Sequence, residues 1–119
     1  MKSLLHVEDS ESMQKAVALM LSEKNISLES VSNGKLALDL TALKQFDGIL
    51  LDLDMPIIDG LEFLSQFNPT KKGTTVLVCS ARHDVNSIYK AIELGASDYI
   101  MKPFTDDILF SKLKQLNLL

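Results

Sequence analysis

Short apolar runs alternate with helical patterns along all 119 residues, and this alternation constrains the fold more than any other feature. Short apolar runs bounded by polar turns indicate strands, and apolar residues spaced three and four apart indicate amphipathic helices. Strands that alternate with helices favour a parallel sheet with helices on both faces. The strands are expected near residues 4–7, 27–32, 49–51, 76–78 and 98–101, each followed by a helix.

The polarity of each run predicts its place in the sheet. The first, third and fourth runs are almost wholly apolar, as expected for strands covered on both faces. Residues 27–32 alternate polar and apolar, and residues 98–101 are more polar than the central runs, so both strands are expected at edges. The pattern predicts an α/β, flavodoxin-like, doubly wound five-stranded parallel sheet. Its strand order is 2-1-3-4-5, with five flanking helices and a ligand crevice between the first and third strands.

Composition narrows the class of protein. The length suits one domain, taken as residues 1–119, and the net charge of -4 argues against direct nucleic-acid binding by this chain. The single Cys79 excludes an internal disulfide and fits a reducing compartment. No apolar run approaches membrane-spanning length, and Glu8 and Asp9 interrupt the apolar start too early for a signal peptide. We expect a cytoplasmic protein with no membrane partner.

Polar residues follow four of the five expected strands. Glu8 and Asp9 follow the first, Asp52 the third, Ser80 the fourth and Lys102 the fifth. Strand carboxyl ends in such a sheet meet at one edge, where three carboxylates would repel one another unless a cation neutralised them. Hard oxygen ligands suit Mg²⁺. A cation, an ammonium group and a hydroxyl around one carboxylate describe a phosphoryl pocket, with Asp52 as the nucleophile.

With these residues in place, the chain resembles the receiver domains of two-component response regulators, of the chemotaxis-regulator type. The motifs that carry the resemblance are Glu8-Asp9, Asp52-Leu53-Asp54-Met55-Pro56 with Gly60, Ser80-Ala81, and Tyr99 followed by Lys102-Pro103-Phe104. Each motif is weak alone, but together and in these strand contexts they are specific. Glu8 departs from the pattern, because many receivers have Asp at this position. Its extra methylene leaves open whether it binds metal directly or through water.

The resemblance implies a regulatory phosphoacceptor, which is not an enzyme in the ordinary sense but promotes its own phosphorylation and dephosphorylation. It implies that Asp52 takes a phosphoryl group from phosphohistidine on a histidine kinase or a histidine phosphotransfer protein. It also implies Mg²⁺ as cofactor. The implied metal ligands are Glu8, Asp9, Asp52 and the backbone carbonyl of Asp54.

The resemblance further implies a switch. Lys102 and Ser80 would hold the phosphoryl group, and Ser80 and Tyr99 would report its presence. The fourth helix, fifth strand and fifth helix, about residues 84–116, would then present a changed surface to a downstream protein or to an attached output domain. The sequence leaves open whether the chain works alone or within a longer protein.

Two residues of opposite charge are expected at the mouth of the pocket. Asp54 follows Asp52 by two positions, and Arg82 follows Ser80 by two. The resemblance implies that these positions flank the pocket, where an exposed ion pair could tune the lifetime of the phosphoryl group. The alternative is that both side chains are simply solvated, since most surface pairs contribute about 0–1 kcal/mol.

Two other functions compete with a phosphorylated receiver. Asp52-Leu53-Asp54 after an apolar strand also resembles the nucleophile and acid of haloacid-dehalogenase-type phosphatases. In that family the nucleophile strand usually comes first and Gly-Thr follows the second Asp, whereas here Met55-Pro56 follows. The other alternative is a receiver-like interaction module that does not use phosphate, and the complete pocket argues against it.

Several of these residues also have ordinary structural explanations. Ser80 could be a turn residue, Tyr99 an edge-strand aromatic and Asp59 a helix start. His6 lies inside the first strand and is expected to be structural, and His83 is expected at the surface. Only the joint placement of the five strand-end residues favours a functional site.

Overall fold

The computed structural model covers residues 1–119 and forms a parallel sheet in the order β2-β1-β3-β4-β5. The strands are β1 (Lys2–Val7), β2 (Ile26–Val31), β3 (Gly48–Leu51), β4 (Thr75–Ser80) and β5 (Asp98–Met101). The helices are α1 (Glu11–Leu21), α2 (Gly34–Leu43), α3 (Gly60–Phe67), α4 (Pro69–Lys72), α5 (Val85–Glu93) and α6 (Asp106–Gln115). The predicted fold class and strand order are confirmed. None of the six helices combines the length and the hydrophobicity that a membrane span requires.

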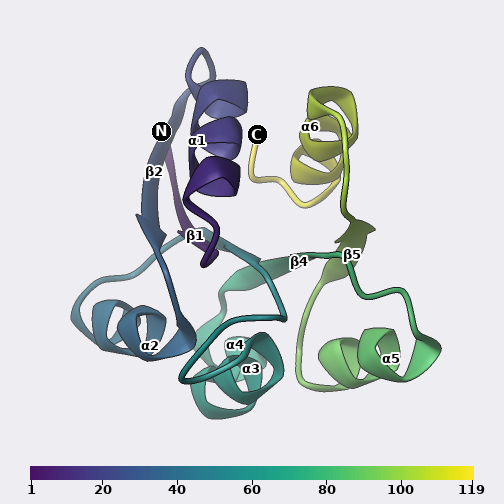
Figure 1. Cartoon of the computed structure of the whole chain (residues 1–119). Coiled ribbons are helices and arrows are strands. Elements are labelled where there is room, and N and C mark those ends of the chain that lie inside the picture. Colours follow the sequence, from purple (N-terminus) through teal and green to yellow (C-terminus); the bar gives the residue numbers. More distant parts are fainter.

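Helices cover both faces of the sheet, and the central strands are buried as a result. In Figure 1, α1 and α6 lie on one side and α2, α3, α4 and α5 on the other. Successive strand residues enter opposite cores, as the pleat requires: Leu5 and Ile49 pack toward the α2–α3 side, whereas Leu4 and Leu50 pack toward α1 and α6. The wholly apolar runs of β1 and β3 follow from this two-sided burial, while the more polar β2 and β5 form the edges.

Side-chain caps begin the helices. The Ser10 hydroxyl accepts a hydrogen bond from the Met13 amide at the start of α1, and Asn33 accepts one from Leu36 at the start of α2. Asp59 caps α3 in the same way, so the structural explanation for this residue is correct.

One segment differs from the prediction. We expected five helices, but α4 forms a single helical turn and raises the number to six. Pro69 occupies its first turn, where a missing N–H costs nothing. Asn68 and Gly73 cap its two ends with positive φ values of 54° and 69°. Three local signals therefore stabilise a helix too short to show a periodic pattern.

The strand register brings the predicted site residues together. Val7 pairs with Leu51 across β1 and β3, so the next residues, Glu8 and Asp52, leave the sheet side by side. Ser80 pairs with Met101 across β4 and β5, which places Lys102 at the same edge. The polar strand ends thus meet because the strands are parallel and similarly aligned.

Candidate functional site

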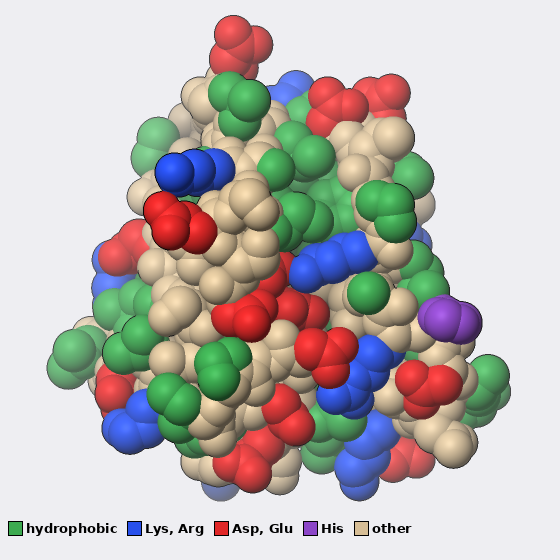
Figure 2. Space-filling view, viewed as in Figure 1, with side chains coloured by type: hydrophobic (Ala, Val, Ile, Leu, Met, Phe, Trp, Pro, Cys, Tyr) green, Lys and Arg blue, Asp and Glu red, His purple; other side chains and the backbone are tan.

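Three carboxylates form the centre of the site. Oxygen atoms of Glu8, Asp9 and Asp52 all lie within 4.8 Å of one another. The Glu8 and Asp52 residues are only 1% and 5% exposed, whereas Asp9 is exposed to solvent. Figure 2 shows acidic side chains gathered at the centre of this face with basic side chains beside them. Hard oxygen donors open to solvent on one side fit a divalent cation such as Mg²⁺.

Lys102 supplies the positive charge nearest to this cluster. Its ammonium group forms an ion pair with Glu8 Oε1 and lies 3.5 Å from Asp52 Oδ2. Burial opposes the charge, but the hydrogen bond to Glu8 and the charge of Asp52 outweigh it and raise the pKa of Lys102. Lys102 therefore stays protonated, with its charge shared between two buried carboxylates.

Both oxygens of Glu8 are engaged by the chain. Oε1 contacts Lys102, and Oε2 accepts a hydrogen bond of 3.0 Å from the Ser10 amide. The Gln14 amide also donates to the Glu8 backbone carbonyl at 2.6 Å. The sequence analysis did not identify Gln14, because nothing in a helical pattern marks a side chain that turns back to the preceding loop.

The negative charge of Asp52 is only partly neutralised by Lys102. Burial raises its pKa to about 6, Lys102 opposes the shift, and Glu8 adds to it. The pKa of Asp9 is raised as well, by desolvation and by its hydrogen bond and charge interaction with Glu8. One ammonium group thus faces three carboxylates, and the excess negative charge favours cation binding.

The backbone around Asp52 holds the carboxylate in place. The Asp52 amide donates to the Val7 carbonyl at 3.0 Å, and Oδ1 accepts from the Asp54 amide at 3.4 Å. Gly60 packs directly beneath this segment: a Cβ atom there would lie 2.4 Å from the Asp52 carbonyl oxygen and 2.7 Å from Leu53 Cα. Gly60 is therefore required because α3 begins against the backbone of the acceptor loop.

Ser80 and Tyr99 are connected through the backbone of Arg82. The fully buried Ser80 hydroxyl accepts from the Arg82 amide at 3.2 Å, and the Tyr99 hydroxyl donates to the Arg82 carbonyl at 2.8 Å. Partial burial of Tyr99 raises its pKa. The sequence placed both residues near the site but gave no sign of this link.

The predicted contact between Asp54 and Arg82 is present. Arg82 Nε and Nη2 lie 2.7 and 2.6 Å from Asp54 Oδ1. The Asp54 side chain is half exposed, and Arg82 Nη1 also lies 3.5 Å from the Ser87 hydroxyl. This ion pair joins the loop after β3 to the loop after β4.

The histidines and the cysteine lie outside this chemistry. His6 is buried, its Nδ1 atom has no hydrogen-bond partner, and burial together with the charge of Lys102 lowers its pKa to about 4. His83 is exposed just before α5, as expected. Cys79 is buried in β4 and has no disulfide partner.

We predict that Asp52→Asn stabilises the metal-free protein at neutral pH. The folded pKa of about 6 exceeds the value of about 4 for an unfolded Asp, so ionisation favours unfolding. The protonated Asp52 favours the folded state. Its contribution to the free energy of unfolding is fully present below about pH 4 and is lost as the pH rises through 6. In chelator at pH 7.5, the variant should gain about 1–2 kcal/mol in urea unfolding, and the gain should vanish near pH 4. Glu93→Gln, an exposed control on α5, should show no such trend; a destabilised Asp52→Asn at pH 7.5 would contradict the prediction.

Comparisons with known proteins identify the family. Residues 4–114 match the response regulator receiver domain family. The response regulator MprA of Mycolicibacterium vanbaalenii is 34% identical over 113 residues, which cover 95% of this chain and 49% of MprA. The chain therefore spans about half the length of the curated relatives it matches.

Solved structures agree with this match. The chemotaxis protein CheY4 of Vibrio cholerae has a TM-score of 0.90 at 26% identity, with 98% of both chains covered. The Mn(2+)-bound form of response regulator Rcp1 has a TM-score of 0.82 at 26% identity, covering 98% of this chain and 92% of Rcp1. The chain belongs to the response regulator receiver domains of two-component signalling, which are regulatory phosphoacceptors and not enzymes that turn over a small substrate.

Proposed function

We propose that Asp52 accepts a phosphoryl group from phosphohistidine in a Mg²⁺-dependent step. The observation that carries this proposal is a buried carboxylate at the end of a central strand, clustered with two further carboxylates and 3.5 Å from an ammonium group. Membership of the family implies a cognate histidine kinase. A histidine phosphotransfer protein is the alternative donor, and the sequence identifies neither.

The geometry suits Asp52 as the nucleophile. With a pKa of about 6, its carboxylate is mostly ionised at pH 7.5 and can attack phosphorus. The new P–O bond replaces the P–N bond to the donor imidazole. Lys102 would hold a phosphoryl oxygen, and the contacts of its ammonium group with Glu8 and Asp52 support this role.

The metal would be held by Glu8, Asp9, Asp52 and the backbone carbonyl of Asp54. Three hard oxygen donors, two of them on carboxyl groups with raised pKa values, fit this role. When bound, Mg²⁺ supplies positive charge to the phosphoryl oxygens. Rcp1, which was solved in a Mn(2+)-bound form, supports the proposal that this chain binds a divalent cation.

The switch would begin at Ser80. If its hydroxyl donates to a phosphoryl oxygen on Asp52, its bond to the Arg82 amide changes, and Arg82 in turn contacts Tyr99. This route leads to the surface formed by α5, β5 and α6, within residues 84–116. The large apolar side chains exposed there are Val85, Tyr89, Ile92, Met101 and Ile108. We propose that this surface binds a downstream protein or an attached output domain.

Three further features of the proposal are the receiver boundaries at residues 1–119, a cytoplasmic location and the absence of direct nucleic-acid contacts. The competing module that ignores phosphate would keep the fold but would not form an acyl phosphate. Phosphorylation therefore separates the two functions directly.

Wild-type protein treated with acetyl phosphate and Mg²⁺ should gain one phosphoryl group, observed by intact mass. Asp52→Asn should gain none, because the amide is not a nucleophile. Asp59→Asn is the matched control, since Asn also caps helices and Asp59 caps α3 at its N-terminus. Phosphorylation of Asp52→Asn at the wild-type rate would refute the assignment.

Ser80→Ala should still fold and accept phosphate, but phosphorylation should cause a smaller conformational change in residues 84–116. Amide hydrogen exchange over residues 84–116 should shift on phosphorylation in wild type and less than half as much in the variant, because the hydroxyl couples the phosphoryl group to Arg82. Lys102→Ala should lose most of the response. Ser65→Ala, an exposed change on α3, is the control. Equal exchange changes in wild type and Ser80→Ala would show that the hydroxyl is not the coupling group.

Arg82→Ala should change the rate of acyl-phosphate decay while altering the free energy of unfolding by only about 0–1 kcal/mol. The substitution removes the guanidinium group but retains the backbone bonds to Ser80 and Tyr99. It frees the Asp54 carboxylate to orient water or to repel phosphate. Decay measured in wild type, Asp54→Asn, Arg82→Ala and the double variant should reveal a coupling of at least about 0.5 kcal/mol. Strictly additive changes in log rate would mean that the ion pair does not set the lifetime.

A further inference from the structure

Helix α5 is held by different kinds of contact at its two ends. At its C-terminal end, Ala91, Leu94 and Ala96 pack against the apolar core on the α2–α3 side of the sheet. At its N-terminal end, residues 83–86 are all exposed, and Ser87 is the first buried side chain. Apolar burial therefore fixes the C-terminal end, whereas the N-terminal end depends on polar contacts.

The short helix α4 supports the C-terminal end of α5. Gly95, just past that end, has a φ of 107°, and a Cβ atom there would lie 2.8 Å from Pro69 Cγ and 3.0 Å from Thr70 Oγ1. The Ser97 amide then donates to the Val76 carbonyl of β4 at 2.8 Å. The C-terminal end of α5 is thus attached both to α4 and to the sheet.

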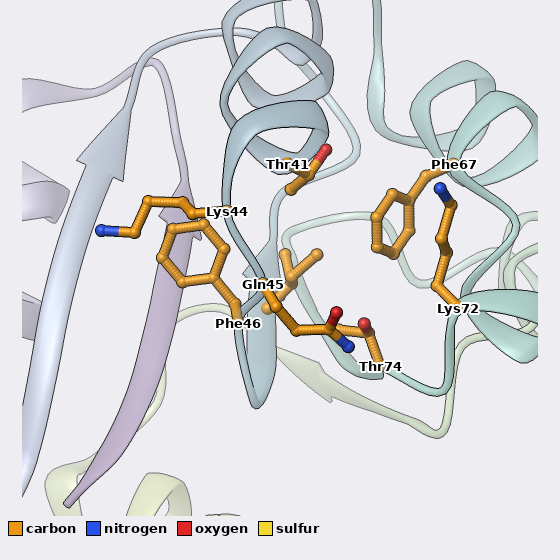
Figure 3. Close-up of a pocket in the computed structure, with 8 residues that line it drawn as sticks. Thr41, Lys44, Gln45, Phe46, Phe67, Lys72 and Thr74 are labelled. Carbon is orange, nitrogen blue, oxygen red and sulfur yellow. The ribbon is translucent and has the colours of Figure 1, made fainter.

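The chain on both sides of α4 is itself anchored in the interior. Figure 3 shows Phe67, at the end of α3, and Thr74, just after α4, lining one small pocket together with Phe46. Both flanking residues are buried, and the Phe67 ring stacks on Phe63 with a centroid separation of 5.2 Å. Packing on both sides therefore fixes the position of α4 relative to the sheet.

Arg82 joins the N-terminal end of α5 to the acceptor loop. Its Nη1 atom lies 3.5 Å from the Ser87 hydroxyl in the first turn of α5, while Nε and Nη2 contact Asp54. The other polar contact of this turn is the cap, in which the Ser87 amide donates to the Asp84 carboxylate at 2.9 Å. The cap lies within the helix, so the guanidinium group of Arg82 is what connects the helix to the site.

We propose that α5 moves as a rigid helix about a hinge at Gly95, and that the contact between Arg82 and Ser87 holds its N-terminal end in the resting position. When this contact opens, residues 84–89 move away from the acceptor loop. Residues 93–97 stay in place, because packing and the hydrogen bond to β4 hold them.

The trigger for this movement rests on the proposed function, whereas the hinge and the contact do not. A phosphoryl group on Asp52 that accepts a hydrogen bond from the Ser80 hydroxyl changes the bond of that hydroxyl to the Arg82 amide. The backbone of Arg82 then shifts and carries its guanidinium group away from the helix. The resting protein therefore tests the hinge and the contact without any phosphodonor.

Amide hydrogen exchange of the resting protein, resolved by NMR, compares the two ends of α5. Protection factors at Ile88 and Tyr89, the N-terminal amides, should be at least about tenfold lower than at Leu94 and Ala96, the C-terminal amides, because only the N-terminal end opens locally. Equal protection at both ends would overturn the hinge.

Ser87→Ala should lower protection of the N-terminal amides about two- to fivefold and leave the C-terminal amides unchanged. Asn86→Ala, an exposed change in the same turn, is the control. Both substitutions raise helix propensity, so a loss of protection in Ser87→Ala alone reports the lost contact. The same effect in both variants, or in neither, would contradict the contact.

A double-mutant cycle assigns the effect of Ser87→Ala to Arg82. Arg82→Ala should also lower protection of the N-terminal amides, and Ser87→Ala added to it should cause less than half of the further change that it causes alone. Strictly additive changes in log protection would show that the hydroxyl acts through the cap at Asp84 and would overturn the role of Arg82.

Pro69→Ala tests the hinge, with Lys71→Ala, an exposed change in the same turn, as its control. Removing the ring that packs on Gly95 should lower protection of the C-terminal amides at least about threefold more than that of Leu50 in the core of β3, which reports global stability. A loss that is equal at Leu50 and at the C-terminal amides would mean that α4 does not hold this end of α5.

Beryllofluoride with Mg²⁺ then tests the movement itself. Chemical shifts of the Asp54 and Gly60 amides report whether the acceptor site is occupied. In occupied protein, protection should fall at residues 84–89 and stay within about twofold at residues 93–97. Equal changes at both ends would contradict the hinge. A protein whose Asp54 and Gly60 amides do not shift would count against the proposed function, and the resting-state measurements would still decide the hinge and the contact.

Discussion

The structure depends on the parallel register that sets Glu8 beside Asp52 at the carboxyl edge of the sheet. Two carboxylates that leave adjacent buried strands cannot avoid each other, and Asp9 adds a third within 4.8 Å. Lys102 is the single nearby cation, and it reaches this edge only because β5 lies next to β4 at a matching height. The raised pKa values of Asp52 and Asp9 are the consequence of this imbalance. Binding of a cation at this cluster should therefore stabilise the folded protein, because it reduces the repulsion among the carboxylates.

The surrounding residues hold the three carboxylates in position but do not neutralise their charge. Gly60 lets α3 begin against the Asp52 backbone, where any side chain would collide with it. The amides of Ser10 and Asp54 donate to Glu8 and Asp52, which orients the carboxylates without adding a full charge. If side chains neutralised all three carboxylates, the folded protein would be more stable, but the site would bind a cation more weakly.

Much of this could be predicted from the sequence. Strand placement follows from apolar runs whose polarity differs between centre and edge, and the joint position of Glu8, Asp9, Asp52, Ser80 and Lys102 after four strands predicts one site. The family resemblance supplied the roles. The start of a helix at Asp59 could also be predicted, because a cap depends on neighbouring residues.

Apart from the Asp54–Arg82 ion pair, contacts between separate loops could not be predicted. The Glu8–Lys102 ion pair, the link from Ser80 to Tyr99 through the Arg82 backbone and the support of Glu8 by Gln14 all join segments whose relative positions only packing decides. The turn α4 was missed because four residues show no helical period.

The most direct test of the central claim is the effect of Mg²⁺ on stability without any phosphodonor. Urea unfolding of wild type at pH 7.5 should show a gain of about 1–2 kcal/mol in about 10 mM Mg²⁺, because the cation binds the folded carboxylate cluster and not the unfolded chain. Asp9→Ala should lose this gain, and Asp39→Ala, which removes an exposed carboxylate on α2, should retain it. A wild-type protein that gains nothing, or an Asp9→Ala variant that gains as much as wild type, would contradict the claim that the three carboxylates form one cation site.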